Sequence, residues 1–145
     1  MTRALAVLAM AVLLAACAAS RKEPPPKPFV GTVWEAVMEL PLPGPQPHVQ
    51  FGDGRMEGWG GCNRFTSRYV QDAVGARAIV IGRIDSGRRG CEPGAQLAES
   101  RFLEVLQSVS SYSIIADSMT MSGSAGSLKF RAKGSELPPP TETRP

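Results

Sequence analysis

The chain contains few of the residues on which most catalytic and metal sites depend. It has one histidine, His48, and three cysteines, at positions 17, 62 and 91. A serine nucleophile activated by histidine therefore has only one possible base. A zinc site built on Cys62 and Cys91 would need two further ligands, and only one histidine exists. No glycine-rich phosphate loop is present either. We expect no catalytic residues, no metal, no cofactor and no enzyme activity.

The chain also lacks a surplus of charge of one sign and a long hydrophobic run. Its 16 basic residues stand against 13 acidic ones, and Arg88-Arg89 is the only basic pair within the expected folded part. This scatter is unlike a nucleic-acid footprint, so we expect no nucleic-acid partner. The longest apolar run, residues 4–16, is shorter than the roughly 20 residues that span a bilayer.

That apolar run has the layout of a secretory signal peptide. It follows Arg3 and ends in small residues, Ala15-Ala16, immediately before Cys17. A cysteine at this point resembles the lipobox of bacterial lipoproteins, which implies cleavage before Cys17 and attachment of lipid, palmitate included, to that residue. The residues immediately after Cys17, Ala18-Ala19-Ser20, include no aspartate. By the same resemblance this implies the outer membrane, with the domain facing the periplasm.

Composition divides the chain into four parts. Residues 1–16 are the predicted signal peptide, and residues 17–28 are a proline-rich tether that cannot bury much surface. Residues 29–133 are long enough for a single domain with one core. Residues 134–145 include Pro138-Pro139-Pro140 and are predicted to be a disordered tail.

Within the domain, the hydrophobic period changes once. Alternation over residues 34–40 and 65–70 predicts strands, and Gly52-Asp53-Gly54 predicts a hairpin turn between two more. After Pro93, apolar residues follow the spacing of an amphipathic helix, and they are Leu97, Ala98, Phe102, Val105, Leu106 and Val109. Three short strands follow. The predicted fold is β-rich α+β, a mostly antiparallel curved sheet or conical barrel with one helix.

Cys62 and Cys91 remain once Cys17 is assigned to the lipid. In an oxidising periplasm the simplest interpretation is a disulfide, with free thiols or a redox-active pair as the alternatives. Cys62 lies between two predicted strands and Cys91 in the loop before the helix, and both have glycine neighbours. A bridge would help to stabilise a domain this small.

The residues around Cys62 resemble the signature of the META domain, which is carried by heat-inducible bacterial lipoproteins of the HslJ type. The segment from Phe51 to Phe65 contains the motif residues Gly58, Gly61, Cys62, Asn63 and Phe65. Other parts of the chain match the family in the expected order, one before this segment and the rest after it. They are Gly31-Thr32-Val33-Trp34, Arg88-Arg89-Gly90-Cys91, Glu99-Ser100-Arg101-Phe102-Leu103 and Leu128-Lys129-Phe130. The resemblance implies a compact β-rich fold with one helix and a linked pair of cysteines, here Cys62 and Cys91.

Most polar and aromatic candidates have ordinary structural explanations. An asparagine such as Asn63 usually bridges local backbone groups through its amide, and Trp34 and Trp59 are expected to fill the core. We expect His48 to be an ordinary strand or loop residue. Two carboxylate pairs, Asp53 with Glu57 and Glu99 with Glu104, are expected to lie on solvated faces.

Three non-enzymatic functions remain at this point. The family resemblance implies an envelope lipoprotein, attached to the membrane through Cys17, that supports envelope integrity under heat or antibiotic stress with an envelope protein as its partner. A second hypothesis is a pilotin-like module that binds a lipid or another hydrophobic ligand, which an apolar cavity would support. A third is a hydrolase inhibitor, for which the proline-rich loop at residues 41–47 is the candidate.

Overall fold

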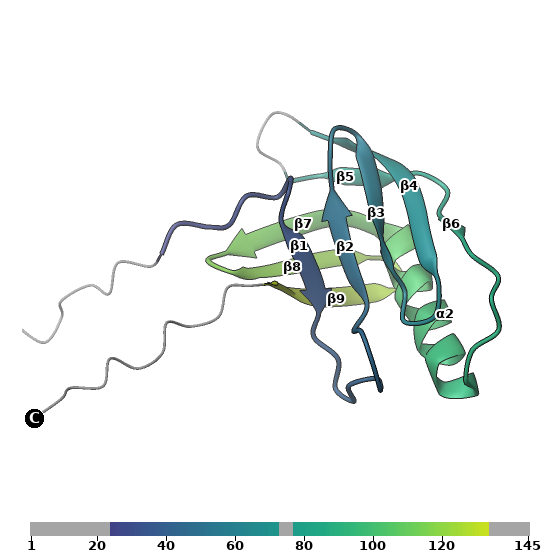
Figure 1. Cartoon of the computed structure of the whole chain (residues 1–145). Coiled ribbons are helices and arrows are strands. Elements are labelled where there is room, and N and C mark those ends of the chain that lie inside the picture. The colour runs from purple at the N-terminus through teal and green to yellow at the C-terminus, as the bar shows by residue number, and fades with distance from the viewer. Residues whose placement is uncertain (1–23, 73–76, 134–145) are drawn as a thin grey trace, which may run out of the picture.

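The computed structural model describes residues 24–72 and 77–133 (Figure 1). The predicted signal peptide, Cys17, most of the tether and the predicted disordered tail lie outside the described residues. The elements in chain order are β1 (Val33–Ala36), β2 (His48–Phe51), β3 (Arg55–Trp59), β4 (Arg64–Gln71), β5 (Ile79–Ile81), β6 (Asp85–Ser86), α2 (Pro93–Ser108), β7 (Val109–Ile115), β8 (Ser118–Gly123) and β9 (Gly126–Ala132).

The strands form one antiparallel sheet that curls into a nearly closed barrel. Their order is β5-β4-β3-β2-β1-β9-β8-β7, and the short strand β6 pairs with β4. The first and last strands pair, with Trp34 opposite Ala132. The two edges of the sheet, β5 and β7, meet at one end. There Ala78 forms a bridge with Ser111, and the Tyr112 N–H donates a 3.0 Å hydrogen bond to the Arg77 carbonyl. The predicted fold class is therefore confirmed.

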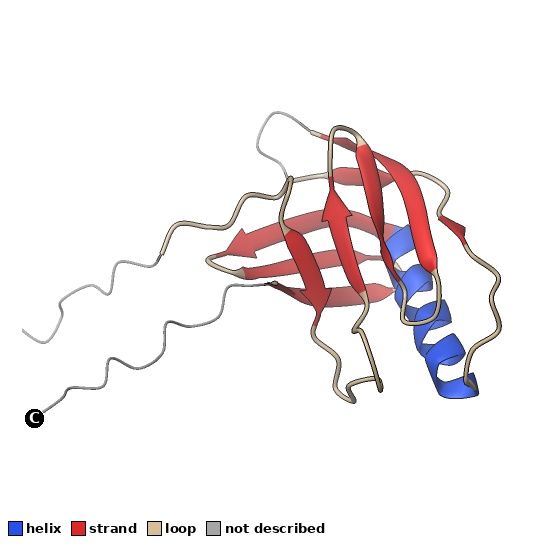
Figure 2. Cartoon of the chain, in the orientation of Figure 1, coloured by secondary structure: helices blue, strands red, loops and turns tan. Residues whose placement is uncertain are grey.

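Large side chains fill the interior of the barrel. Those with at most 1% of their surface exposed include Trp34, Phe51, Met56, Phe65, Leu106, Met119, Met121 and Phe130. The strand alternation expected over residues 65–70 is confirmed, because Phe65, Ser67 and Tyr69 point inward. Helix α2 crosses one end of the barrel (Figure 2), where the ring of Phe102 lies 6.0 Å from Phe65 and 6.2 Å from Phe130.

The N-terminal segment enters near the end of the barrel away from the helix (Figure 1). There Phe29 stacks on Phe51 with ring centroids 4.2 Å apart and on Tyr112 at 4.4 Å, and its carbonyl accepts a 3.2 Å hydrogen bond from Trp34 Nε1. The Lys27 N–H also donates to the Ala116 carbonyl at 2.7 Å. The chain is thus held against the barrel from Lys27 onward, two residues before the predicted boundary.

Two details of the predicted elements are wrong. The first strand ends at Ala36 instead of Leu40, and Val37 and Leu40 are exposed. Opposite its end lies Pro47, whose carbonyl accepts from the Ala36 N–H but which has no N–H with which to continue the ladder. The helix does begin at Pro93, but Leu97 is 67% exposed and does not belong to its buried face.

Candidate functional site

The disulfide between Cys62 and Cys91 fixes one end of the molecule. The two Cα atoms lie 5.9 Å apart, and the bridge ties the β3–β4 loop to the segment immediately before α2. This pairing confirms the interpretation of the two cysteines as a disulfide. It also brings the Arg88–Arg89 segment beside the loop that carries Asn63.

Glu99 is buried beneath this loop, contrary to the expectation that it lies on a solvated face. Only 8% of its surface is exposed. Its Oε2 accepts hydrogen bonds from the backbone N–H groups of Cys62 at 3.0 Å and Asn63 at 2.5 Å, and its Oε1 accepts from Asn63 Nδ2 at 3.0 Å. The carboxylate therefore satisfies two backbone donors that the loop buries, and it also accepts from the Asn63 side chain. Glu104, the other member of the expected pair, is exposed and bonds to Arg101.

The amide of Asn63 extends the same network to the arginine segment. Its Oδ1 accepts from the Arg89 N–H at 2.9 Å, and its Nδ2 donates to the Arg89 carbonyl at 3.3 Å. Asn63 thus satisfies both backbone groups of Arg89, much as a neighbouring strand would. The interpretation of Asn63 as a bridge between backbone groups is confirmed, although its partner lies 26 residues further along the chain.

The structure requires glycine at the motif positions, either because neighbouring atoms leave no room for a Cβ or because the backbone has a positive φ. A Cβ at Gly58 would lie 2.1 Å from the His48 carbonyl and 2.7 Å from the ring of Phe65. A Cβ at Gly60 would lie 2.7 Å from Glu99 Oε2, and Gly61 has a φ of +113°. The motif residues therefore shape the loop around the buried carboxylate, while Phe65 anchors it in the core.

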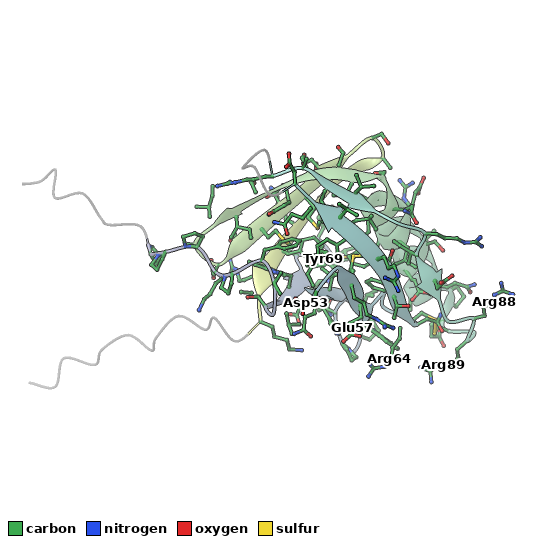
Figure 3. The ribbon with its side chains drawn as sticks, turned by 90° about the horizontal axis from the view of Figure 1, so that it is seen from above. Asp53, Glu57, Arg64, Tyr69, Arg88 and Arg89 are labelled. Atoms are coloured by element: carbon green, nitrogen blue, oxygen red, sulfur yellow. A yellow bond between two sulfur atoms is a disulfide. The ribbon has the colours of Figure 1, made fainter. Side chains whose placement is uncertain are left out.

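Three exposed arginines lie at the same end of the molecule as this network. Arg64, Arg88 and Arg89 lie at the end away from the N-terminal segment (Figure 3). The ion pairs within residues 24–72 and 77–133 involve none of these three side chains. The disulfide and Asn63 fix the backbone on both sides of Gly90, so the Arg88–Arg89 pair is displayed from a braced loop.

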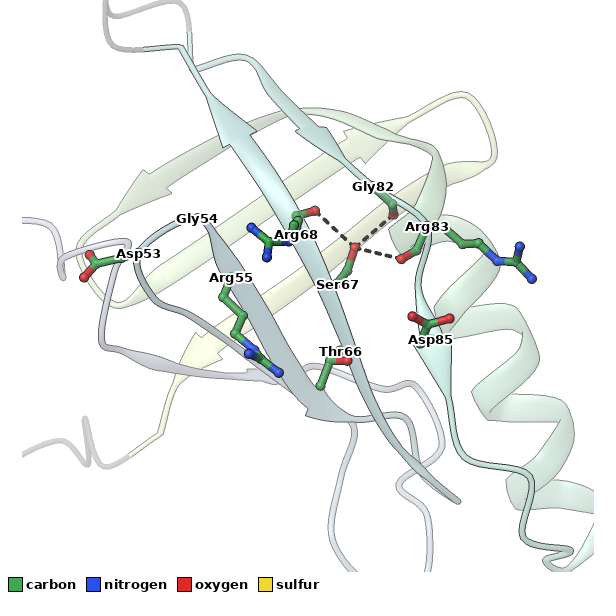
Figure 4. Close-up of a pocket in the computed structure, with 9 residues that line it drawn as sticks. All are labelled: Asp53, Gly54, Arg55, Thr66, Ser67, Arg68, Gly82, Arg83 and Asp85. Carbon is green, nitrogen blue, oxygen red and sulfur yellow. Dashed lines mark hydrogen bonds between the residues drawn. The ribbon is translucent and has the colours of Figure 1, made fainter.

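A second polar feature is a hollow of about 620 Å³ on the outer face of the β3–β4 hairpin (Figure 4). Its lining residues are Asp53, Gly54, Arg55, Thr66, Ser67, Arg68, Gly82, Arg83 and Asp85. Arg55 of β3 lies directly opposite Arg68 of β4. Behind them, the Ser67 hydroxyl lies 3.0 to 3.2 Å from the carbonyls of Gly82, Arg68 and Arg83, which ties β4 to the segment after β5.

The remaining candidates have mixed outcomes. Trp34 fills the core as expected, but Trp59 is only half-buried, and its indole N–H has no partner within the described part of the chain. His48 begins β2 as an ordinary strand residue, and Asp53 and Glu57 are exposed as expected. No three histidine, cysteine or acidic side chains of the described residues are grouped to hold a metal ion. None of the described helices has both the length and the hydropathy needed to cross a membrane.

Burial also perturbs one ionisable group near the N-terminal end of the barrel. The Tyr69 hydroxyl donates to the Gly52 carbonyl at 2.5 Å. Removal from water raises the pKa of this phenol above its ordinary value of 10.0, and the charge of Asp53 acts in the same direction. The phenol therefore serves as a structural donor instead of a base.

Comparison with known proteins identifies the domain. The META domain family model matches residues 29–135. The fold is similar to the NMR structure of a protein from Burkholderia xenovorans, with a TM-score of 0.57 and 19% identity over 73% of this chain and 84% of that one. It is also similar to a DUF4847 family protein from Bacteroides vulgatus, with a TM-score of 0.52 and 11% identity over 71% and 93% of the two chains. No curated protein matches the chain.

Proposed function

Because this chain belongs to the META domain family, we propose that it is a non-enzymatic lipoprotein that supports the bacterial envelope under heat or antibiotic stress. In this proposal residues 1–16 are removed, Cys17 carries the lipid, and the domain extends into the periplasm from the outer membrane. Its working surface is the end that displays Arg88 and Arg89, which binds an acidic partner in the envelope.

The relative position of the two ends of the domain carries this proposal. The N-terminal segment enters at one end of the barrel, and the disulfide-braced arginine loop lies at the other (Figures 1 and 3). A lipid attached ahead of the tether would therefore leave the arginine loop pointing away from the membrane. The disulfide suits an oxidising compartment such as the periplasm.

The filled interior favours a function on the outside of the barrel. The residues that would line an internal ligand site, such as Trp34, Phe51 and Met121, are completely buried against one another. An acyl chain would have to displace these side chains at considerable cost, because protein interiors are close-packed. This packing counts against the hypothesis of a pilotin-like module with a hydrophobic ligand inside.

Anchoring is tested by fractionating cells that produce either the natural chain or the Cys17→Ser variant. The proposal expects the natural chain in the outer membrane and the variant in the soluble periplasm or unprocessed in the inner membrane. Outer-membrane permeability after a heat shift, measured by entry of a hydrophobic dye, should rise in a deletion strain and return to normal only with the natural chain. An identical membrane location for both chains would contradict lipid attachment at Cys17.

The loop between β1 and β2 keeps the inhibitor hypothesis as a second candidate. Leu40 is 83% exposed beside this proline-rich segment. The Gln46 side chain braces the loop, since its Nε2 donates to the Leu42 carbonyl at 2.8 Å and its Oε1 accepts from the Leu42 N–H at 3.2 Å. A rigid loop with one exposed leucine suits the active-site cleft of a protease. Inhibition that is lost in Leu40→Asp would support this candidate, and no inhibition across a panel of proteases and lysozymes would dismiss it.

A further inference from the structure

The hollow on the β3–β4 hairpin is lined by two arginines that form no ion pair with any residue in the described part of the chain. In the antiparallel register, Arg55 and Arg68 are directly opposite each other, and both side chains are exposed. A directly opposed pair lies on one face of the hairpin. In Figure 4 the two side chains extend in different directions along that face, and Arg83 points away from both. The ion pairs of the described residues join other side chains, and they are Arg101–Glu104, Arg131–Asp117 and Lys133–Glu35.

Two like charges at directly opposed positions destabilise the pairing of the two strands that carry them. The backbone at these two positions is nevertheless held in register, because the Tyr69 N–H donates to the Gly54 carbonyl at 3.1 Å and the Ser67 hydroxyl ties β4 to Gly82. The two arginines therefore project from directly opposed positions beside the hollow, and Figure 4 shows a gap between their guanidinium groups. An anion between them would turn this repulsion into two attractive contacts.

We propose that this hollow binds a phosphate group between Arg55 and Arg68. A planar guanidinium offers paired N–H donors that match two phosphate oxygens, and two such groups can hold one phosphate from both sides. Thr66 also lines the hollow on β4 and offers a hydroxyl. The volume of about 620 Å³ leaves room for an organic group attached to the phosphate.

The acidic residues of the hollow limit which anions it accepts. Asp53 and Asp85 line it together with the three arginines. Their charges disfavour an extended polyanion, so the hollow suits one compact phosphate. The phosphate could be free in solution or belong to a lipid headgroup, and the proposal does not depend on lipid attachment at Cys17.

Binding is measured on the full chain purified in mild detergent, with inorganic phosphate followed by calorimetry and by thermal unfolding. A second arm measures sedimentation with vesicles of phosphatidylglycerol in phosphatidylcholine. The variants are Arg55→Gln and Arg68→Gln. The matched control is Arg101→Gln, which removes the same charge from an exposed position on α2 that does not line this hollow.

The expected result is saturable binding that falls at least about tenfold in either test variant and stays within about twofold in Arg101→Gln. Without phosphate, Arg55→Gln and Arg68→Gln should unfold at the same temperature as the natural chain or higher, because each removes the like-charge contact. Binding of inorganic phosphate identifies a free phosphate, and binding only to vesicles identifies a headgroup. No binding in either arm, or equal losses in all three variants, would overturn the proposal.

Discussion

The substitution Glu99→Gln tests whether the buried carboxylate holds the disulfide end of the molecule together. The carboxylate accepts three hydrogen bonds, two on Oε2 from backbone N–H groups and one on Oε1 from Asn63 Nδ2. A glutamine retains only one acceptor oxygen. If that oxygen faces the backbone, the new NH₂ group faces the Asn63 NH₂ group, donor against donor. If it faces Asn63, the two backbone donors lose their partner.

The cheaper arrangement loses one hydrogen bond to a charged acceptor and weakens two others. Bonds to charged groups contribute roughly 1.5–3 kcal/mol, so we expect the free energy of unfolding to fall by about 2–3 kcal/mol. For a domain of about a hundred residues this lowers the melting temperature by roughly 10–15 °C. Denaturant unfolding followed by tryptophan fluorescence, with the disulfide intact, measures the change.

Glu104→Gln is the matched control because it makes the same chemical change on the same helix. The Glu104 side chain is 58% exposed and pairs with Arg101 at 3.3 Å. Exposed pairs of this kind contribute at most about 1 kcal/mol, and typically less than half of that on a helix. If Glu99→Gln and Glu104→Gln change the free energy of unfolding by the same small amount, the role assigned to Glu99 is wrong.

Three further outcomes are expected. Cys62→Ala and Cys91→Ala should each lower the free energy of unfolding by roughly 3–4 kcal/mol, because either substitution removes the same disulfide. Unequal losses in denaturant unfolding would contradict the view that the two cysteines stabilise the domain only through their bridge. Stability should fall as the pH rises above about 10, since the unfolded chain then releases the Tyr69 proton while the folded chain, with its raised pKa, retains it. Tyr69→Phe should remove that part of the pH dependence in unfolding experiments at pH 9 to 11, and an unchanged slope would count against it. Gly58→Ala should lower the free energy of unfolding by more than about 2 kcal/mol, because the added Cβ would lie 2.1 Å from the His48 carbonyl. A free energy of unfolding equal to that of the natural chain would show that the hairpin can relax there.

Local sequence signals predicted much of the fold because they depend on neighbouring residues. The alternation of Phe65, Ser67 and Tyr69 was sufficient to orient β4, and Pro93 marked the start of the helix. The pairing of Cys62 with Cys91 followed from the compartment and from the family resemblance. The end of β1 could not be predicted in this way, because it depends on the partner strand, where Pro47 interrupts the ladder.

The buried polar network depends on contacts that are distant in sequence. Glu99 accepts its donors from a loop 36 and 37 residues earlier in the chain, and no local pattern reports that distance. One signal was available: Glu99 precedes Phe102 by three residues and Leu106 by seven, which places it on the buried stripe of the helix. Charge alone suggested exposure, and that inference was wrong.

The Arg55–Arg68 pair was missed for a related reason. The register of the β3–β4 hairpin is set by an irregular loop, residues 60–63, whose shape depends on the disulfide and on Glu99. A two-residue turn would have fixed the register from sequence, whereas this loop does not. The braced loop therefore determines both which residues face each other in the hollow and where Arg88 and Arg89 are displayed.

The proposal that the braced arginine loop is the working surface is tested most directly by envelope permeability in cells whose only copy carries both Arg88→Ala and Arg89→Ala. Both side chains are exposed, so the variant should fold, reach the membrane and unfold at the natural temperature. We predict that dye entry after a heat shift rises to the level of the deletion strain, while cells with Arg101→Ala keep a normal barrier. A normal barrier in the Arg88→Ala, Arg89→Ala cells would contradict the proposed function of this surface.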